Sequence, residues 1–250
     1  MLTTILAAGG GASQNPYGLW EALQQGGVIA WSVFIILVVM LFFSLYIFFT
    51  KLFEQQKIIN QGRRVRQTFW SSNSLREGAA KLAKNSAYRQ LVDDGLTAQE
   101  QYKELTDPVE AHDWLHGSLA RSEGTINSAL GGGLAFLATV GATAPFIGLF
   151  GTVIGIYRAL IKIGAAGQAS IDAVAGPVGE ALIMTALGLV VAVPAVLAYN
   201  FLQRRNKAIA EQMNAFSNDV LGYLASDGRV RPVARKGAPA TKAPAATTAA

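Results

Sequence analysis

Three long stretches of this chain are apolar and nearly free of charge. The first, from Gly26 to Thr50, and the second, from Gly124 to Tyr157, contain no charged residue. The third covers residues 173–203 and contains a single charged residue, Glu180. An α-helix needs about 20 consecutive apolar residues to cross a bilayer, so each stretch predicts a transmembrane helix.

Polar sequence separates the three stretches and divides the chain into eight segments. The predicted fold class is an all-α integral membrane protein, with three transmembrane helices extended by long cytoplasmic helices. The tail is rich in Pro, Ala, Lys and Thr and is predicted to be disordered, because such a composition cannot bury a core. The predicted segments are an N-terminal periplasmic segment (1–26), membrane helix one (27–50), a cytoplasmic helical segment (51–130), membrane helix two (131–157), a periplasmic connection (158–172), membrane helix three (173–203), a cytoplasmic helix (204–226) and the tail (227–250).

One helix start is predicted inside the polar segment before the second apolar stretch. Asp107 followed by Pro108 is typical of a helix N-terminus, with Asp as the cap and Pro at the first helical position. We expect this helix to run through Trp114 and Arg121 and to continue into the second transmembrane helix.

Positive charges follow the first and third apolar stretches directly. Basic residues are frequent from Lys51 to Arg66 and again from Arg204 to Lys207. Since lysine and arginine concentrate on the cytoplasmic side of membrane helices, the N-terminus is predicted to be periplasmic and the C-terminus cytoplasmic. Arg158 and Lys162 then lie outside, against this rule. The net charge of +5 is explained by topology and predicts no nucleic-acid partner.

Composition and motifs argue against an enzyme or a metal protein. Only 15% of the residues are charged, 51% are hydrophobic, and there is no cysteine. His112 and His116 have the spacing of a helical metal site, but no third ligand is evident, so no metal is predicted. No nucleophile with a neighbouring base and no phosphate-binding loop is present. We therefore expect neither enzymatic activity nor a cofactor.

Small residues recur along the second and third apolar stretches. Such residues allow membrane helices to approach closely, where packing replaces the missing hydrophobic force. Two interpretations are open: packing against helices of other subunits, which is favoured, and a compact monomeric bundle. The predicted packing positions are Gly148, Gly151, Gly155 and Gly188, and the predicted kinks are Pro145, Pro177 and Pro194.

Glu180 is the residue that most requires an explanation. A carboxylate at membrane depth costs roughly 2.5–3.5 kcal/mol on insertion scales and is usually functional. If the second and third membrane helices are antiparallel, Thr152 and Thr185 lie at a similar depth. Glu180 and Thr185 are about 140° apart on an ideal helix, so either a local distortion rotates them onto one stripe or they face different neighbours.

The two apolar stretches that contain these residues resemble the ExbB/TolQ/MotA family. The resemblance is carried by residues 139–156 (TVGATAPFIGLFGTVIGI) and 176–200 (GPVGEALIMTALGLVVAVPAVLAYN). It is strong over about residues 125–225, and Ala144-Pro145-Phe146 is more similar to the ExbB branch than to TolQ. The resemblance implies a proton-driven motor of the bacterial inner membrane, with five copies around a pore.

The resemblance also implies partners and roles. In the ExbB branch of the TonB-ExbB-ExbD system, ExbD-like single-span helices lie in the pore and a TonB-like protein is energised for uptake of iron-siderophores and vitamin B12. Protons are the coupling ion, and membrane phospholipid is a candidate ligand. Glu180, Thr152 and Thr185 would line the proton path, although Glu180 could instead fix subunit register. The alternatives are a TolQ-like subunit of the Tol-Pal system and a stand-alone ion channel or transporter.

Overall fold

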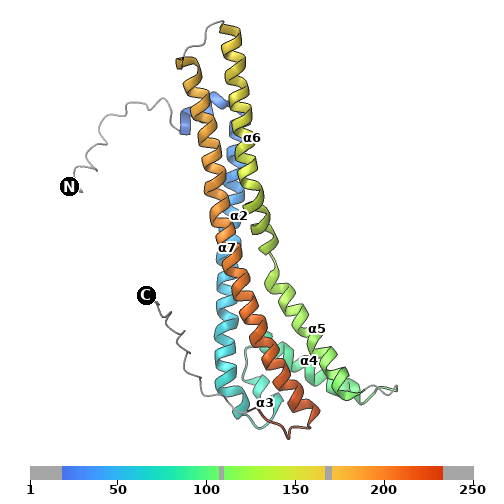
Figure 1. The fold of residues 1–250 in the computed structure, drawn as a ribbon. Helices are drawn as coiled ribbons and strands as arrows, with labels where there is room; N and C mark the ends of the chain where they lie inside the picture. The colour runs from blue at the N-terminus through green and yellow to red at the C-terminus, as the bar shows by residue number, and fades with distance from the viewer. Residues whose placement is uncertain (1–18, 107–109, 167–170, 233–250) are drawn as a thin grey trace, which may run out of the picture. The chain divides into compact units, whose positions relative to one another are not determined.

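The computed structural model describes residues 19–106, 110–166 and 171–232, and every regular element within these ranges is helical. The predictions for residues 1–18, for Asp107-Pro108, for part of the connection and for most of the tail lie outside the described residues. Figure 1 shows the arrangement. The helices are α2 (Leu19–Thr68), η2 (Phe69–Ser71), α3 (Leu75–Ala80), α4 (Ala87–Tyr102), α5 (Ala111–Gly131), α6 (Leu134–Ala166) and α7 (Ile171–Ala225).

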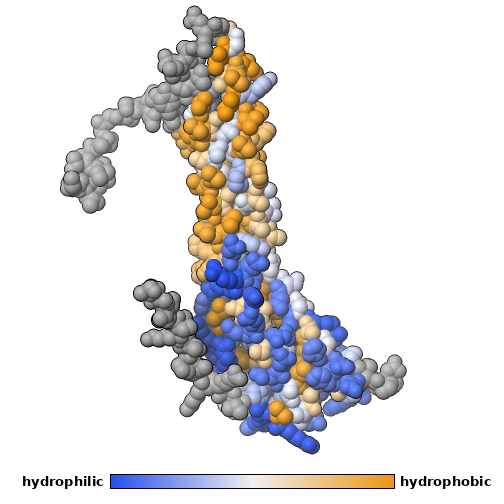
Figure 2. Space-filling view, viewed as in Figure 1, coloured by the Kyte–Doolittle hydropathy of each residue, from blue (hydrophilic) through white to orange (hydrophobic). Residues whose placement is uncertain are grey.

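The chain forms two compact units, and the long helices α2 and α7 contribute to both. Residues up to Thr50 together with Gly133–Leu202 form one unit, here called the apolar unit. Lys51–Gly132 together with the chain from Gln203 onward form the other, here called the polar unit. Figure 2 shows hydrophobic residues over the helices of the apolar unit and hydrophilic residues over the polar unit.

Three helical stretches are long and apolar enough to cross a membrane, and they include α2, α6 and α7. Their common core is small, because large side chains such as Phe42, Phe146 and Leu182 are more than 60% exposed. Exposed apolar surface of this extent is expected for helices solvated by lipid. The chain is therefore an integral membrane protein of the helical type. The core residues are Leu23, Ala30, Val33 and Leu37 from α2, Val140 and Ala144 from α6, and Met184, Val191, Ala192 and Ala195 from α7.

Two glycines with positive φ interrupt the long helical stretches. Gly27 has φ 59° and ψ −150°, so Leu19–Gly26 is a separate short helix before the membrane-spanning part of α2. Gly133 has φ 82° and lies between the end of α5 and the start of α6. The prediction of one helix running from Pro108 into the second span was therefore wrong. Three consecutive glycines, Gly131–Gly133, carry little helix propensity, and Gly133 adopts a backbone conformation that other residues avoid.

The end of α5 is stabilised by polar side chains from α2 and α7. The last carbonyl groups of a helix have no partner within it and need one from elsewhere. Lys51 Nζ donates to the Ala129 carbonyl at 2.9 Å, and Asn206 Nδ2 donates to the Leu130 carbonyl at 3.0 Å. Gln55 is fully buried, and its Nε2 donates to Asn206 Oδ1 at 2.6 Å. These bonds explain why polar residues are buried in this part of the polar unit.

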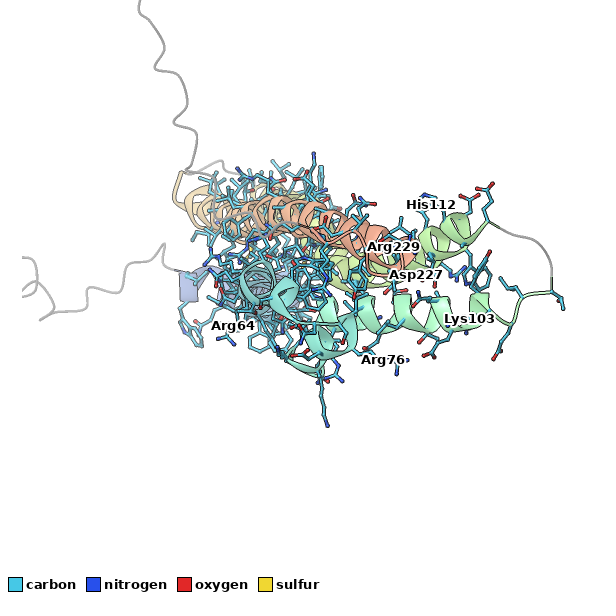
Figure 3. The ribbon with its side chains drawn as sticks, turned by 90° about the horizontal axis from the view of Figure 1, so that it is seen from below. Arg64, Arg76, Lys103, His112, Asp227 and Arg229 are labelled. Atoms are coloured by element: carbon cyan, nitrogen blue, oxygen red, sulfur yellow. The ribbon has the colours of Figure 1, made fainter. Side chains whose placement is uncertain are left out.

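The polar unit has its own hydrophobic core, built from α3, α4, α5 and the ends of α2 and α7. Leu91, Leu119, Met213 and Val220 are almost completely buried in it. Tyr88 is also buried there, and burial raises the pKa of its phenol above the usual range, an effect that the Arg66 cation partly offsets. Figure 3 shows charged side chains at the edge of this unit.

The short helix α3 is held by polar bonds at its N-terminus. Ser74 Oγ accepts from the Glu77 backbone N–H, and the Glu77 carboxylate accepts from the N–H of Asn73, one residue before the cap, which is a variant of the capping box. Lys81 and this Asn73 N–H lower the pKa of Glu77. A helix of six residues is not stable by itself, so these bonds and the burial of Leu75 and Ala79 fix its position.

Candidate functional site

Glycines bring the backbones of α6 and α7 into direct contact. A Cβ atom on Gly148 would lie 2.6 Å from the Met184 carbonyl oxygen, and one on Gly188 would lie 2.7 Å from the Ala144 carbonyl oxygen. Gly151 faces Met184, and Gly155 faces Ala181 at ordinary van der Waals distance. All four predicted packing glycines are thus used within one copy of the chain. These contacts lie within one copy, and the predicted packing of the two helices against other subunits stays a prediction.

The contacts also establish that α6 and α7 are antiparallel. Gly148 is next to Gly188, whereas Gly155, about two turns further along α6, is next to Ala181 and Pro177. Residue numbers therefore rise along one helix as they fall along the other. Figure 1 shows the two helices side by side.

Thr152 and Thr185 lie on the same side of this helix pair. At about 100° per residue, Thr152 is offset roughly 60° from the centre of the α6 contact and Thr185 roughly 70° from the centre of the α7 contact. Because the helices are antiparallel, the two offsets have the same direction in space. Helix α2 packs on the opposite side, where Val33 approaches Gly151 and shares a core cluster with Met184.

Large apolar side chains surround the two threonines on this side of the helix pair. We call this surface, with Thr152 and Thr185, the hydroxyl face. Its apolar members range from 37% to 68% exposed, so α2 does not cover them. They are Leu149 and Ile156 from α6 and Val178, Leu182 and Leu189 from α7.

The two hydroxyl groups differ in their surroundings. Thr152 is 8% exposed, and its Oγ1 donates to the Leu149 carbonyl at 2.7 Å, so its lone pairs remain able to accept a hydrogen bond. Thr185 is half-buried at the edge of the contact. By comparison, Thr139 and Thr143 donate to carbonyls four residues earlier on their own helix. The hydroxyl face thus offers weakly polar atoms in an otherwise apolar surface.

Glu180 belongs to α7, but its side chain lies outside the described residues. The backbone around it is helical from Ile171 onward, and the helix continues through Pro177 and Pro194, as α6 continues through Pro145. In this regular helix Glu180 and Thr185 remain about 140° apart. The roles of Glu180 and the three prolines stay predictions.

The histidine pair is not part of a metal site among the described residues. The His112 and His116 rings stack with centroids 6.3 Å apart on the exposed side of α5, and the described residues include no group of three metal-ligating side chains. Figure 3 labels His112 near the start of this helix.

Sequence reasoning missed the role of Arg158. This residue is half-buried, and its guanidinium donates to the carbonyl of Gly26, at the break before Gly27. A cation is favourable at a helix C-terminus, where carbonyl groups lack partners. The signal in the sequence that could have pointed to it was the conflict between Arg158 and the positive-inside rule.

Three helices apolar and long enough to cross a membrane, two of them in close backbone contact, define a helical membrane protein. Residues 83–215 match the MotA/TolQ/ExbB proton channel family. The chain belongs to this family.

Curated relatives agree with this assignment. The chain is 37% identical over 213 residues to the biopolymer transport protein ExbB of Xanthomonas campestris pv. campestris, a match that covers 81% of this chain and 84% of that protein. It is 44% identical over 153 residues to ExbB of Neisseria gonorrhoeae, covering 59% and 70% respectively. The Tol-Pal system protein TolQ of Haemophilus influenzae is 35% identical over 179 residues, covering 66% and 75%.

Proposed function

We propose that this chain is the ExbB-type subunit of a motor driven by the proton-motive force in the bacterial inner membrane. Five copies would surround the single-span helices of an ExbD-like partner, and the assembly would energise a TonB-like protein. The N-terminus would be periplasmic, and the polar unit and C-terminus would be cytoplasmic. The uptake of iron-siderophores and vitamin B12 is the expected cellular result.

The observation that carries this proposal is the hydroxyl face. A surface that is largely apolar but holds two hydroxyl groups suits a dry pore, in which a partner's protonatable acid must be neither strongly solvated nor fixed in an ion pair. Each proton that crosses 100 mV releases about 2.3 kcal/mol, enough to bias a packed element between two positions. In this proposal Thr152 and Thr185 accept hydrogen bonds from the partner's acid or donate hydrogen bonds to it.

Glu180 has a separate part in the proposal. Its position in α7 is one residue before Ala181, which packs on Gly155. As a relay it would exchange protons with the partner; as a structural acid it would bond a neighbouring helix. Glu180→Gln keeps hydrogen-bonding capacity but removes the charge, so a relay predicts loss of coupled uptake with assembly retained. Full uptake by this variant would exclude the relay.

Isolation of the complex tests the motor proposal directly. The full chain, expressed with its neighbouring genes and purified in detergent, should bring down a single-span protein with an acid in its membrane helix. Mass photometry should then give five copies of the chain in each complex. A homogeneous chain without such a partner, but with proton flux in vesicles, would instead favour a stand-alone channel.

The TolQ branch is the second candidate, favoured by the 35% identity to TolQ of Haemophilus influenzae. Genetic rescue separates the two branches. A subunit of the ExbB type should restore growth on iron-siderophores to a strain that lacks its own ExbB and TolQ proteins. A subunit of the TolQ type should restore detergent resistance instead.

A further inference from the structure

Helices α4 and α5 of the polar unit border a pocket that the proposed motor function does not use. Its volume is about 220 Å³. Trp114 Nε1 donates to the Ala98 carbonyl at 2.9 Å, and Ser122 Oγ donates to Asp94 Oδ2 at 2.6 Å, so the two helices are antiparallel. The pocket is lined by Asp94, Thr97 and Gln101 from α4 and by Ser118, Arg121, Ser122 and Thr125 from α5.

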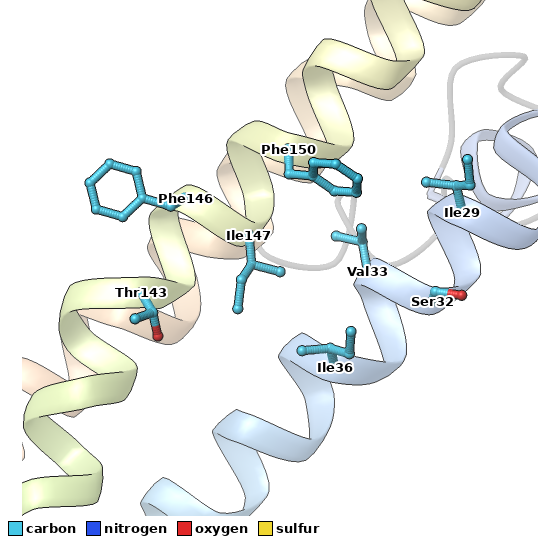
Figure 4. A pocket seen from close by; sticks show the side chains of 8 residues that line it. All are labelled: Ile29, Ser32, Val33, Ile36, Thr143, Phe146, Ile147 and Phe150. Atoms are coloured by element: carbon cyan, nitrogen blue, oxygen red, sulfur yellow. The ribbon is translucent and has the colours of Figure 1, made fainter.

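Every residue that lines this pocket has a polar side chain. By contrast, the groove between α2 and α6 in Figure 4 is lined mainly by isoleucine, valine and phenylalanine, and it belongs to the exposed apolar surface of the membrane helices. Elsewhere α4 and α5 pack through core residues such as Leu91 and Leu119, which is the usual chemistry of a contact between amphipathic helices. A hollow lined by polar groups beside such a contact suits a polar ligand.

The pocket holds one carboxylate and one guanidinium that do not pair with each other. Asp94 is half-buried, and after it has accepted from Ser122 its carboxylate can still accept further hydrogen bonds. Arg121 is exposed, and its guanidinium makes no hydrogen bond or ion pair with any residue that the structure describes. Asp94 would repel a simple anion and Arg121 a simple cation, whereas a ligand with both charges matches both groups.

The pocket also offers neutral donors and acceptors away from this charged pair. Asp94 and Gln101 are about 10 Å apart along α4. The side chains of Gln101 and Ser118 make no hydrogen bond to other parts of the described chain, so both can donate and accept. Thr97 and Thr125 donate to carbonyls four residues earlier on their own helices, so their oxygens remain acceptors. An amide group on a ligand could bond to several of these atoms.

We propose that this pocket binds a small zwitterion, an α-amino acid with an amide side chain, with its ammonium at Asp94 and its carboxylate at Arg121. The two charged groups of an α-amino acid share one carbon atom, so they suit two charged side chains at the same end of a pocket. The side chain extends toward Gln101. The volume suits a ligand of roughly ten non-hydrogen atoms, because drug-sized molecules occupy about 300 Å³ or more.

The site is in the polar unit and the hydroxyl face is in the apolar unit, so the test measures ligand binding and does not depend on motor activity. A ligand of this size should bind with a Kd of roughly 0.1–1 mM, which suits saturation-transfer NMR with the full chain in detergent. L-glutamine should receive saturation from the protein. No transfer to L-glutamine would overturn the proposal.

Two truncated ligands test the charges without any change to the protein. Glutaramic acid lacks the α-ammonium of L-glutamine, and 4-aminobutanamide lacks its carboxylate. Each should bind at least about tenfold more weakly than L-glutamine, as expected for the loss of one charge-assisted hydrogen bond. Equal binding of the three compounds would show that the opposite charges are not recognised together and would overturn the proposal.

Two variants with matched controls locate the site. Asp94→Asn removes the charge but can still accept from Ser122, and it should weaken L-glutamine binding at least about tenfold. Asp93→Asn, at the neighbouring exposed carboxylate outside the pocket, should bind like the unmodified chain. Arg121→Gln should weaken binding to a similar extent, whereas Arg64→Gln, at an exposed arginine of α2, should not. Unchanged binding by both pocket variants would place the ligand elsewhere and overturn the proposal.

Discussion

Helices α6 and α7 approach each other most closely at Gly148 and Gly188, where the side chain is only a hydrogen atom. At each position the atoms that a methyl group would meet belong to the backbone of the other helix, which cannot rotate away as a side chain can. Packing at this density makes even one additional carbon costly. The register of the two helices, and hence the shared side of Thr152 and Thr185, therefore rests on these two glycines.

Gly188→Ala should destabilise the chain by about 1–3 kcal/mol, since the new Cβ would lie 2.7 Å from the Ala144 carbonyl oxygen. Unfolding in detergent micelles by titrated SDS, followed by circular dichroism, measures the change. Gly164→Ala is the matched control in α6, because a Cβ there meets nothing within 4 Å. Equal stability of the two variants would show that the helices do not touch at Gly188.

Tyr88 links the stability of the polar unit to pH. Burial raises the pKa of its phenol above the unfolded value of about 10, so the folded state binds its proton more tightly. The stabilisation is fully present below pH 10 and is lost as pH rises through the folded pKa, by up to about 1.4 kcal/mol for each pH unit between the two values.

Replacing the Tyr88 phenol should remove the loss of stability that its ionisation causes at alkaline pH. Tyr88→Phe should flatten the fall in unfolding free energy above pH 10, measured as denaturation midpoints across pH 8–11.5. Tyr157→Phe, at an exposed tyrosine, should retain the slope of the unmodified chain. The same slope in both variants would contradict the assignment of the effect to burial of Tyr88.

At the scale of elements, the break between α5 and α6 is the feature that the hydrophobic pattern did not predict. Uncharged residues continue from Gly124 to Tyr157 without interruption, so hydropathy shows no boundary at Gly133. The boundary depends on a positive φ and on bonds from Lys51 and Asn206 to the end of α5, and these partners are distant in sequence. The three membrane helices were predictable because bilayer thickness fixes the length of an apolar stretch.

Substitutions within Gly131–Gly133 should show whether the chain breaks between α5 and α6 at Gly133 or continues as one helix. Gly133→Ala should destabilise the chain by about 1–3 kcal/mol, because alanine is strained at φ 82° and its Cβ would lie 3.0 Å from Ile47. Gly131→Ala, where a Cβ meets nothing within 4 Å, should be neutral or stabilising by up to about 1 kcal/mol. Thermal unfolding of both variants measures this, and a reversed order would place the break elsewhere.

At the scale of the whole molecule, the sequence predicted candidate site residues but not the surface to which they belong. The spacing of glycines on α6 and α7 is the same whether they pack within one copy or between copies, and the structure uses them within one. That contact leaves the apolar members of the hydroxyl face uncovered by the rest of the described chain, while Thr152 is buried and Thr185 half-buried among them. The partner proposed for this face would therefore belong to another chain, and periodicity alone could not have predicted this consequence of packing.

The hydroxyl face yields the sharpest functional prediction for the assembled protein. Thr152→Val with Thr185→Val removes both hydroxyls with little change in shape. Uptake driven by the proton-motive force should fall roughly tenfold if each hydroxyl contributes an ordinary hydrogen bond to proton transfer. The measurement is initial-rate siderophore uptake in cells with matched protein levels.

The control must remove a hydroxyl from the same helix without touching this face. Thr139→Val does so, because Thr139 lies about 140° around α6 from Thr152 and donates to the Ala135 carbonyl of its own helix. Uptake should be preserved in this control, and both variants should co-purify with the single-span partner in unchanged amounts. If the double variant transports normally, the pore must be lined by a different face of α6 and α7, and the close glycine contact would then serve folding without orienting the proton path.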